Sequence, residues 1–320
     1  EGKRVGSAGW WNTIAVSEEI RKEGLVAKNF MGDAFSNEMK KDVIKYIKEE
    51  FGGKIDLLVY SLASAVRTDP NTGEMYRSAL KSTAKEITGP TINLEKETMD
   101  MGTMGIATEE EISSTVKVMG GEDWKLWIEF LDNAGVLTEN FKTVAYSYLG
   151  PKVTYGIYKE GTIGAAKRDL EGTSDYLNDY LKTKYNGEAY VSLSKALMTK
   201  ASAVIPIFPL YATLLYKVMK AKGLHEGTIE QKQRLFKDMM YGGKPELDSN
   251  RRLRPDNWEM REDVQSEVEA IWDTITPENF KEIGDYEGVR EEFMQLNGFD
   301  FDNIDYSADV NLEELAKLKP

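Results

Sequence analysis

Apolar residues in the first part of the chain alternate between helical and strand-like spacing. Residues 10–23 carry a helical pattern that ends at Gly24, and the apolar run at 25–30 predicts a short buried strand. Ser36 can cap a following helix in which apolar residues recur at helical intervals. The near-continuous apolar run at 54–63 predicts another strand, of the kind that parallel sheets bury on both faces. This order predicts an α/β fold with a doubly wound parallel sheet.

The middle of the chain departs from this alternation and then returns to it. Residues 80–107 are rich in Thr, Gly and Met, and they predict a hairpin that leaves the sheet. The pattern after this hairpin predicts the following elements in order: two helices within 107–135 divided by Gly120 and Gly121, a buried strand at 142–150, a long helix at 162–185, a strand at 188–194, and helices near 209–222 and 227–240.

The last quarter of the chain has a different composition. It opens with a polar, turn-rich stretch at 241–258, where we expect a loop or small hairpin, and its clearest helical pattern is at 260–275. Because no linker rich in Pro or Ser divides the chain, we predict a Rossmann-like domain at 1–240 with a C-terminal helical extension at 241–320 packed on it.

Composition excludes several classes of function. The net charge of −13 argues against a nucleic-acid-binding protein, although an anionic ligand could still bind at helix N-termini. The 320 residues include no cysteine and one histidine, His225, so we expect no metal site and no Ser-His-Asp triad. The absence of a secretory signal or an 18-residue apolar run leads us to expect a cytoplasmic protein without a membrane span.

Tyr158 and Lys167 are the first candidates for chemistry, because Tyr/Lys pairs polarise carbonyl groups in many reductases. An α-helix turns about 100° per residue, so a separation of nine residues would point the two side chains in opposite directions. The two can converge only where the backbone between them is not one regular helix. Gly161 and Gly164 lie in this interval and permit such a break.

A competing pair lies beside the first one. Tyr155 and Lys159 are four residues apart and would share one face of a helix. On spacing alone this is the more regular pair, and tyrosine and lysine are common in this chain. The residues by themselves leave both pairs open, together with the alternative that neither pair has a catalytic role.

The sequence closely resembles the trans-2-enoyl-CoA reductases and the related FabV-type enoyl-acyl-carrier-protein reductases. The likeness is closest to the clostridial crotonyl-CoA reductases and covers nearly all of the chain. It is carried by the following segments: YSYLGP, IYKEGTIGAAK, VSLSKALMTKASAVIPIFPLY, GWWN, GDAFS, VYSLASAVRTDP, KVMGGEDW and NGFDFDNIDY.

The resemblance implies a fold of the extended short-chain dehydrogenase type, with NADH as hydride donor and no tightly bound flavin. In this family the dyad is a Tyr and a Lys separated by eight residues, which implies Tyr158 and Lys167 rather than the four-residue pair. Tyr158 would donate to the thioester oxygen as an enolate forms, and Lys167 would stabilise its anion and hold the ribose. Tyr148 would lie beside the thioester and share the oxyanion role.

The resemblance also implies binding residues. Phe208, Ala212 and Tyr216 form one helical stripe that would line the acyl pocket, although such a stripe is usually a core face. Strand ends are where open α/β sheets bind ligands. The residues implied for the cofactor, besides Lys167, are Asp33 and Ala34 at the adenine, Ser61, Leu62 and Ala63 along the cleft, and Leu197 and Thr199 near the nicotinamide.

One part of the family pattern is not found. The likeness begins after the second strand of the family, so we expect a fold that is N-terminally truncated by its first β-α-β unit, which carries the Gly-rich phosphate turn. A 320-residue molecule complete in itself would then bind NADH weakly. We therefore expect a monomeric crotonyl-CoA reductase acting on an acyl-CoA thioester. The alternatives are an enoyl reductase acting on acyl carrier protein and a non-catalytic remnant.

Overall fold

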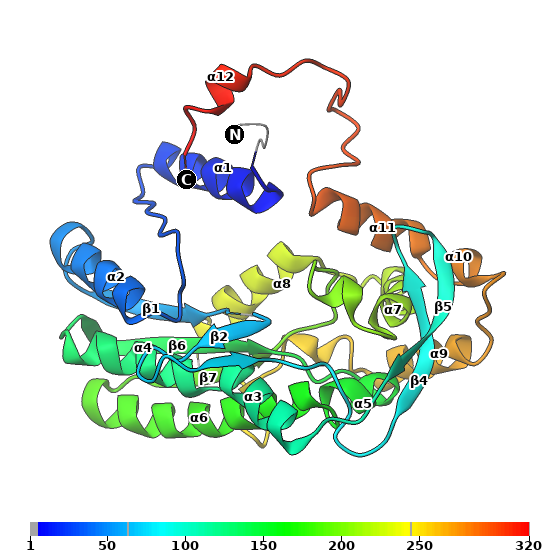
Figure 1. Cartoon of the computed structure of the whole chain (residues 1–320), viewed down its shortest axis with the longest axis horizontal. Coiled ribbons are helices and arrows are strands. Elements are labelled where there is room, and N and C mark those ends of the chain that lie inside the picture. The colour runs from blue at the N-terminus through cyan, green and yellow to red at the C-terminus, as the bar shows by residue number, and fades with distance from the viewer. Residues whose placement is uncertain (1–5, 63, 244, 320) are drawn as a thin grey trace.

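The computed structural model describes residues 6–62, 64–243 and 245–319, and a parallel sheet lies at its centre (Figure 1). The strand order is β1-β6-β7-β8, and all three neighbouring pairs run parallel. The strands are β1 (Ile55–Tyr60), β6 (Leu137–Ser147), β7 (Glu188–Leu193) and β8 (Arg252–Leu253). The predicted α/β class with a parallel sheet is therefore confirmed.

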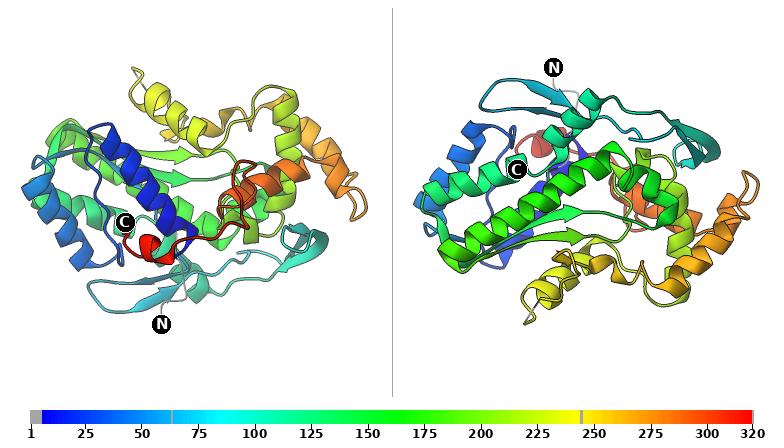
Figure 2. Two further views of the ribbon diagram at one scale, coloured as in Figure 1. Left: turned by 90° about the horizontal axis from the view of Figure 1, so that it is seen from above. Right: turned by 90° about the horizontal axis from the view of Figure 1, so that it is seen from below.

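The two faces of the sheet are covered by different helices (Figure 2). Val144 pairs in register with Tyr190, and both belong to the cluster that includes Leu235 and Met240 of the π-helical turn η3 (Leu235–Met240). The next residues along each strand, Ala145 and Val191, belong instead to the cluster with α4 (Glu122–Asn133) and α6 (Thr162–Tyr185). This alternation buries the central strands on both faces, as a parallel sheet requires.

The N-terminal segment agrees with the predicted helices but not with the predicted strand. Ser7 caps α1 (Ala8–Lys22), and the hydroxyl of Ser36 accepts from the Met39 N–H at 3.1 Å to cap α2 (Asn37–Glu50). The predicted strand at 25–30 is wrong, because this segment is extended but unpaired and 64% of Leu25 is exposed. A strand needs a hydrogen-bonded neighbour, and none lies beside this segment in the described ranges.

The prediction of a strand buried on both faces at 54–63 is also only partly right. A strand does form there, but it is β1, at the edge of the four-stranded sheet. Val59 is 36% exposed and Asp56 is exposed, because β6 is the only strand that pairs with β1 among the described residues. An apolar run therefore predicted the strand correctly and its place in the sheet wrongly.

The predicted hairpin within 80–107 is confirmed. It consists of β4 (Ile87–Asn93) and β5 (Thr98–Met104), which pair antiparallel over their whole length. A smaller hairpin of β2 (Val66–Thr68) and β3 (Met75–Arg77) was not predicted. After the hairpins, α3 (Glu109–Met119) and α4 are divided at Gly120 and Gly121, as the sequence indicated.

A second hydrophobic core lies beside the sheet and joins the middle of the chain to its C-terminal part. It contains α7 (Phe208–Ala221), α9 (Glu262–Trp272) and α11 (Tyr286–Gln295), with Ile92 and Met104 from the hairpin. The remaining elements are η1 (Lys152–Thr154), α5 (Tyr155–Tyr158), η2 (Ser202–Val204), α8 (Thr228–Arg234), η4 (Pro255–Asn257), α10 (Phe280–Ile283) and α12 (Leu312–Leu315). No helix in the part of the chain that the structure describes is long and apolar enough to cross a membrane.

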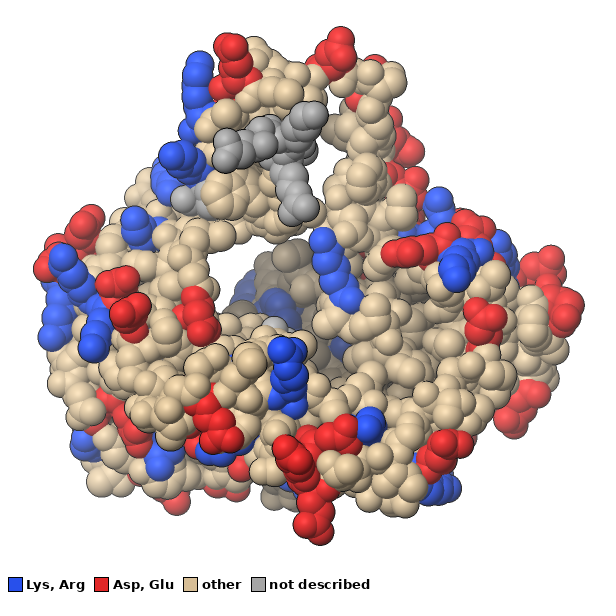
Figure 3. All heavy atoms as spheres, viewed as in Figure 1, with Lys and Arg blue, Asp and Glu red and all other residues tan. Residues whose placement is uncertain are grey.

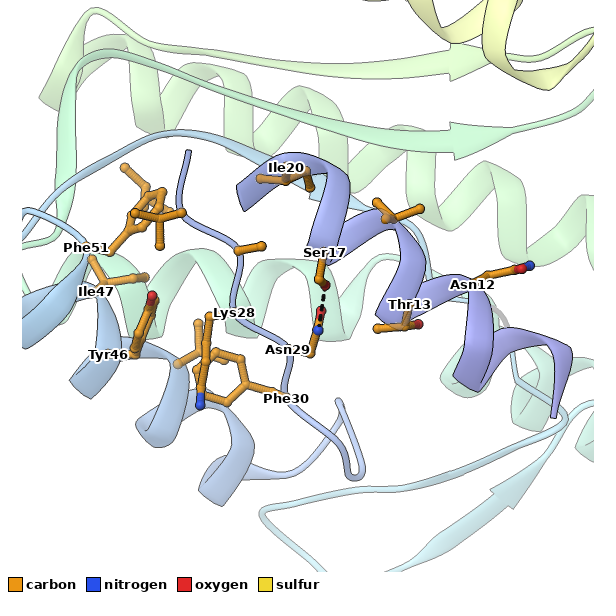
Figure 4. A pocket seen from close by; sticks show the side chains of 15 residues that line it. Asn12, Thr13, Ser17, Ile20, Lys28, Asn29, Phe30, Tyr46, Ile47 and Phe51 are labelled. Atoms are coloured by element: carbon orange, nitrogen blue, oxygen red, sulfur yellow. Dashed lines mark hydrogen bonds between the residues drawn. The ribbon is translucent and has the colours of Figure 1, made fainter. Parts of the chain in front are cut away.

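The surface has two notable features. On the face drawn in Figure 3, basic and acidic side chains are interspersed, so the acidic excess does not form one patch there. A groove of about 700 Å³ lies between α1, the 26–30 segment and α2 (Figure 4). Its lining is mostly apolar, and across it the Asn29 amide donates to the Ser17 hydroxyl at 2.8 Å. None of its lining residues is a predicted site residue.

Candidate active site

Tyr158 and Lys167 lie on two different helical segments. Tyr158 is the last residue of α5, and the backbone leaves helical geometry before Gly161, whose φ of −107° and ψ of 178° are extended. A new helix, α6, starts at Thr162 and carries Lys167 in its second turn. The break that the nine-residue spacing required is therefore present.

The two glycines between these residues allow the segments to approach closely. A Cβ atom on Gly161 would lie 2.4 Å from the carbonyl oxygen of Ile157, and one on Gly164 would lie 2.3 Å from that of Lys159. Real side chains do not tolerate such contacts with backbone atoms. Both positions therefore need glycine because of packing between α5 and α6.

Lys167 reaches back from α6 towards the sheet. Its Nζ donates to the carbonyl oxygen of Tyr146 near the end of β6, at 3.3 Å. Burial lowers the pKa of Lys167 to about 8, although the nearby carboxylate of Glu171 opposes this effect. Since an ammonium has three donors, the two that remain are available to a ligand or to another side chain.

Three aromatic rings meet beside this break. Tyr148, which follows β6 directly, contacts Tyr158 edge to face with ring centroids 4.6 Å apart. Phe208, the first residue of α7, lies 5.8 Å from the ring of Tyr148 and 6.0 Å from that of Tyr158. Burial is the main cause that raises the pKa of both tyrosines, so both phenols are neutral donors at neutral pH.

The predicted cofactor residues after the strands lie at one edge of the sheet. Ser61 and Leu62 follow β1 and are exposed, while Leu197 and Thr199 follow β7 and are half-buried. Because β1, β6 and β7 are parallel, these residues lie at the same carboxyl edge as Tyr148. Ala63 lies outside the described residues.

Asp33 and Ala34 lie in the turn before α2. Asp33 is exposed, and its carboxylate accepts from the Phe35 N–H at 3.0 Å. The Ala34 carbonyl accepts from the indole of Trp127 on α4 at 3.2 Å. The buried Lys40 Nζ fixes this turn further, since it donates to the carbonyl of Phe35 at 2.7 Å and pairs with a carboxylate on α4.

The predicted acyl stripe lies on the buried face of α7. Phe208, Ala212 and Tyr216 are each at most 2% exposed. Phe208 contacts both tyrosines of the aromatic cluster, whereas the hydroxyl of Tyr216 accepts from the Met198 N–H at 3.1 Å and donates to a carboxylate of α11 at 2.6 Å. The structure thus brings Phe208 to the Tyr158 ring and gives Tyr216 two hydrogen bonds within the core.

Models of known protein families match most of the chain. The model described as the trans-2-enoyl-CoA reductase catalytic region matches residues 4–241, which is more than half of the protein. The chain belongs to the trans-2-enoyl-CoA reductase family. A second model, described as the enoyl reductase FAD binding domain, matches residues 247–310.

Named members of the family are similar over nearly the whole chain. An NADH-dependent trans-2-enoyl-CoA reductase of Clostridium beijerinckii is 54% identical over 99% of this chain and 80% of its own length. An NADH-dependent enoyl-acyl-carrier-protein reductase of Photobacterium profundum is also 54% identical, over 99% of this chain and 79% of its own. The crystal structure of the Clostridium acetobutylicum trans-2-enoyl-CoA reductase in complex with NAD superimposes with a TM-score of 0.97 at 52% identity, covering 100% of this chain and 82% of that one.

The competing tyrosine and lysine contact each other, and Tyr155 is half-buried. The Nζ of Lys159 sits 4.5 Å from the ring centroid of Tyr155, and the Lys159 side chain is exposed. This is a cation–π contact, which contributes about 0.5–1 kcal/mol at exposed sites. Neither residue takes part in the aromatic cluster around Tyr158.

Sequence reasoning missed one residue of this reductase site, Glu259. Its side chain is fully buried between η4 and α9, and its Oε1 accepts from the hydroxyls of Tyr148 at 2.9 Å and Tyr211 at 2.7 Å. Its Oε2 accepts from the Ala196 N–H at 2.6 Å. Glu259 directly follows the stretch at 241–258 that predicted a loop or small hairpin, and that pattern gave no sign of a buried carboxylate.

Proposed function

We propose that this reductase uses NADH to reduce the trans-2 double bond of short-chain enoyl-CoA, converting crotonyl-CoA to butyryl-CoA. The observation that carries the proposal is the contact between Tyr148 and Tyr158 at the carboxyl edge of the sheet, with the Lys167 ammonium on the adjoining helix. The names of the clostridial relatives support the substrate and the cofactor. Two tyrosines whose rings touch, followed along the chain by a buried lysine, suit a reaction that builds negative charge on a thioester oxygen.

The carboxyl edge offers polar groups that fit the cofactor. The hydroxyl of Ser147, at the end of β6, is buried and without a hydrogen-bond partner in the part of the chain described. Lys167 uses one of its three donors on the Tyr146 carbonyl. The residues that would hold NADH are Asp33, Ala34, Ser61, Leu62, Ala63, Lys167, Leu197 and Thr199.

NADH would supply the hydride that adds to the β-carbon of the bound substrate, and the resulting enolate would take a proton at its α-carbon to give the saturated thioester. Tyr158 donates to the thioester oxygen as this atom acquires enolate charge, and Tyr148 contributes a second hydroxyl from the adjoining ring. Lys167 places a positive charge near Tyr158 and thereby stabilises its anion. Phe208, Ala212 and Tyr216 would bound the acyl chain, and the small Ala212 leaves the most room among them.

Replacing the central tyrosine tests the proposal. Tyr158→Phe removes the donor but keeps the ring, so crotonyl-CoA-dependent oxidation of NADH should fall by at least about 10²-fold. Tyr155→Phe is the matched control, since this ring contacts the exposed Lys159 and lies outside the aromatic cluster, and it should keep nearly full activity. Equal activity of the two variants would show that Tyr158 has no part in the reaction.

An enoyl-acyl-carrier-protein reductase is the second candidate, because the relative of Photobacterium profundum bears that name at the same identity. Carrier proteins are acidic and would favour a basic docking surface. No such patch gathers on the face drawn in Figure 3. Comparing kcat/KM for crotonyl-CoA and for crotonyl-acyl-carrier-protein decides between the two, and we expect the CoA thioester to be the better substrate.

A further inference from the structure

Glu259 is a buried carboxylate that no step above uses, although it touches the proposed site. It comes from the last quarter of the chain, between η4 and α9. Its carboxylate accepts hydrogen bonds from three segments: the residue after β6, the loop after β7 and the helix α7. Its charge raises the pKa of both Tyr148 and Tyr158. The carboxylate is therefore close enough to act on both proposed donors.

The protonation state of the Glu259 carboxyl decides whether the Tyr148 hydroxyl donates to it or to another group. An ionised carboxylate is an acceptor only, so the hydroxyl of Tyr148 donates to it and is not available to a substrate. A protonated carboxyl has one O–H, which can donate to a tyrosine oxygen instead. The oxygen of Tyr211 already accepts from the Gln265 amide at 3.1 Å, and its proton is directed to Glu259. Tyr148 is thus the tyrosine whose hydrogen bond with Glu259 can change direction, from donating to accepting.

We propose that Glu259 is a positioning residue that controls whether the Tyr148 hydroxyl is available to the substrate oxygen. When Glu259 is protonated, it donates to Tyr148, and the Tyr148 proton can turn towards the developing enolate. When Glu259 is ionised, it holds that proton and adds a negative charge near the oxygen that must also become negative. The inference rests on the function proposed above.

The surroundings of Glu259 bring its titration close to neutral pH. Burial raises its pKa to about 7, while the Tyr211 hydroxyl, the Ala196 N–H and the Lys195 ammonium oppose the shift. The titratable and charged groups that bear on it are Tyr148 after β6, Lys195 after β7, Tyr211 and Tyr216 on α7, Tyr158 on α5 and Asp256 on η4. Lys195 is itself held by the carbonyls of Ala196 and Glu226, both at 3.1 Å.

The direction of the pH dependence follows. Glu259 is mostly protonated below about pH 7, so Tyr148 is available there, and kcat should fall as the pH rises through about 7. In Glu259→Gln the amide oxygen can accept from the Ala196 N–H while the NH₂ group donates to Tyr148. Towards Tyr148 this variant copies the protonated state at every pH, although its NH₂ group, unlike a carboxyl oxygen, cannot accept from Tyr211. Its kcat should therefore stay level through about pH 7 and exceed that of the wild type above it.

The test measures kcat for crotonyl-CoA from about pH 6 to about pH 7.2, where most of Lys167, whose pKa is about 8, keeps its charge. We expect about a two-fold decline in the wild type and a nearly level profile in Glu259→Gln. Tyr148→Phe should also be level, and adding Glu259→Gln to it should change nothing further. The proposal would be overturned if kcat of Glu259→Gln still fell with rising pH. It would also be overturned if Glu259→Gln changed kcat in the Tyr148→Phe variant as much as it does in the wild type.

Asp132→Asn is the matched control, because Asp132 on α4 also accepts from two tyrosine hydroxyls, Tyr180 and Tyr185, and pairs with Lys184, none of which is a proposed site residue. It should keep the wild-type pH profile.

An infrared difference spectrum between wild type and Glu259→Gln supplies a readout that needs no substrate. The carbonyl band of a protonated carboxyl should titrate near pH 7, and its absence throughout would sink the proposal even if the enzyme were active. Loss of activity in all forms, including the wild type, would instead contradict the proposed function.

Discussion

At the scale of single residues, burial pushes the ionisable groups of the site towards their neutral forms. It raises the pKa of Tyr158, lowers that of Lys167 to about 8 and raises that of Glu259 to about 7. Each of these shifts has desolvation as its largest cause. In such surroundings a charge that develops on a substrate is poorly screened, so the few donors at the carboxyl edge act on it strongly.

Lys167 offers the clearest test at this scale. Lys167→Met keeps the length of the side chain but removes the charge that stabilises the Tyr158 anion, so kcat/KM should fall on the order of 10²-fold. Because the pKa of Lys167 is about 8, the wild type should also lose activity as the pH rises above about 8. Steady-state NADH oxidation measures both effects.

Lys159→Met is the control for this substitution. It removes a lysine eight residues away in sequence whose side chain is exposed and whose only aromatic contact is with Tyr155. We expect nearly unchanged kinetics. Similar losses in the two variants would mean that the charge of Lys167 has no special role.

At the scale of elements, the turn between α5 and α6 determines how Tyr158 and Lys167 lie. One continuous helix would separate them by half a turn, whereas the structure ends α5 at Tyr158 and restarts at Thr162. The close contact of Gly164 with the Lys159 carbonyl sets how near α5 can lie to α6. A small change at this glycine should therefore alter the site without touching a reactive group.

Gly164→Ala is expected to move α5 and to reduce both stability and activity. Its Cβ would lie 2.3 Å from a backbone oxygen, which should cost about 1–3 kcal/mol and displace Tyr158. Gly172→Ala, in the same helix, meets nothing within 4 Å and should stabilise the protein by about 0.5–1 kcal/mol. Urea denaturation and NADH oxidation report the two effects. A Gly164→Ala variant as stable and active as Gly172→Ala would contradict this account.

Local sequence predicted these elements better than it predicted their neighbours. The cap at Ser36 and the glycine break before Thr162 depend on nearby residues, and the helices that follow them begin where the sequence indicated. The segment at 25–30 has the composition of a strand but lacks a pairing partner in the described ranges. In contrast, Arg252 and Leu253 lie in a polar, turn-rich stretch and yet pair with β7, because a strand is defined by its neighbour.

The residues of the candidate site also differ in how far the sequence could predict them. Spacing and glycines left the pair of Tyr158 and Lys167 open beside that of Tyr155 and Lys159, and the resemblance to the family selected the first pair. Glu259 is separated from Tyr148 by 111 positions, and only the folded chain brings their side chains within 2.9 Å. A buried carboxylate stabilised by such distant donors leaves no periodic signal in its own segment.

At the scale of the whole molecule, the C-terminal part is joined to the sheet by packing and by the site itself. Residues after 241 contribute β8 to the sheet, Glu259 to the site and α9 and α11 to the second core. The predicted segments 1–240 and 241–320 therefore share one hydrophobic core. We expect the two parts to unfold together.

A pair of phenylalanines tests this expectation. Phe280 is 3% exposed and packs edge to face on Tyr286 at 5.4 Å within the second core, so Phe280→Ala should lower the free energy of unfolding by about 3–5 kcal/mol. Phe299→Ala is the control, because half of that ring is exposed, and its effect should be much smaller. Leu131→Ala, in the core under the sheet, should shift the same transition as Phe280→Ala. Urea unfolding followed both by circular dichroism and by loss of NADH oxidation would reveal a second transition if the C-terminal part unfolded alone.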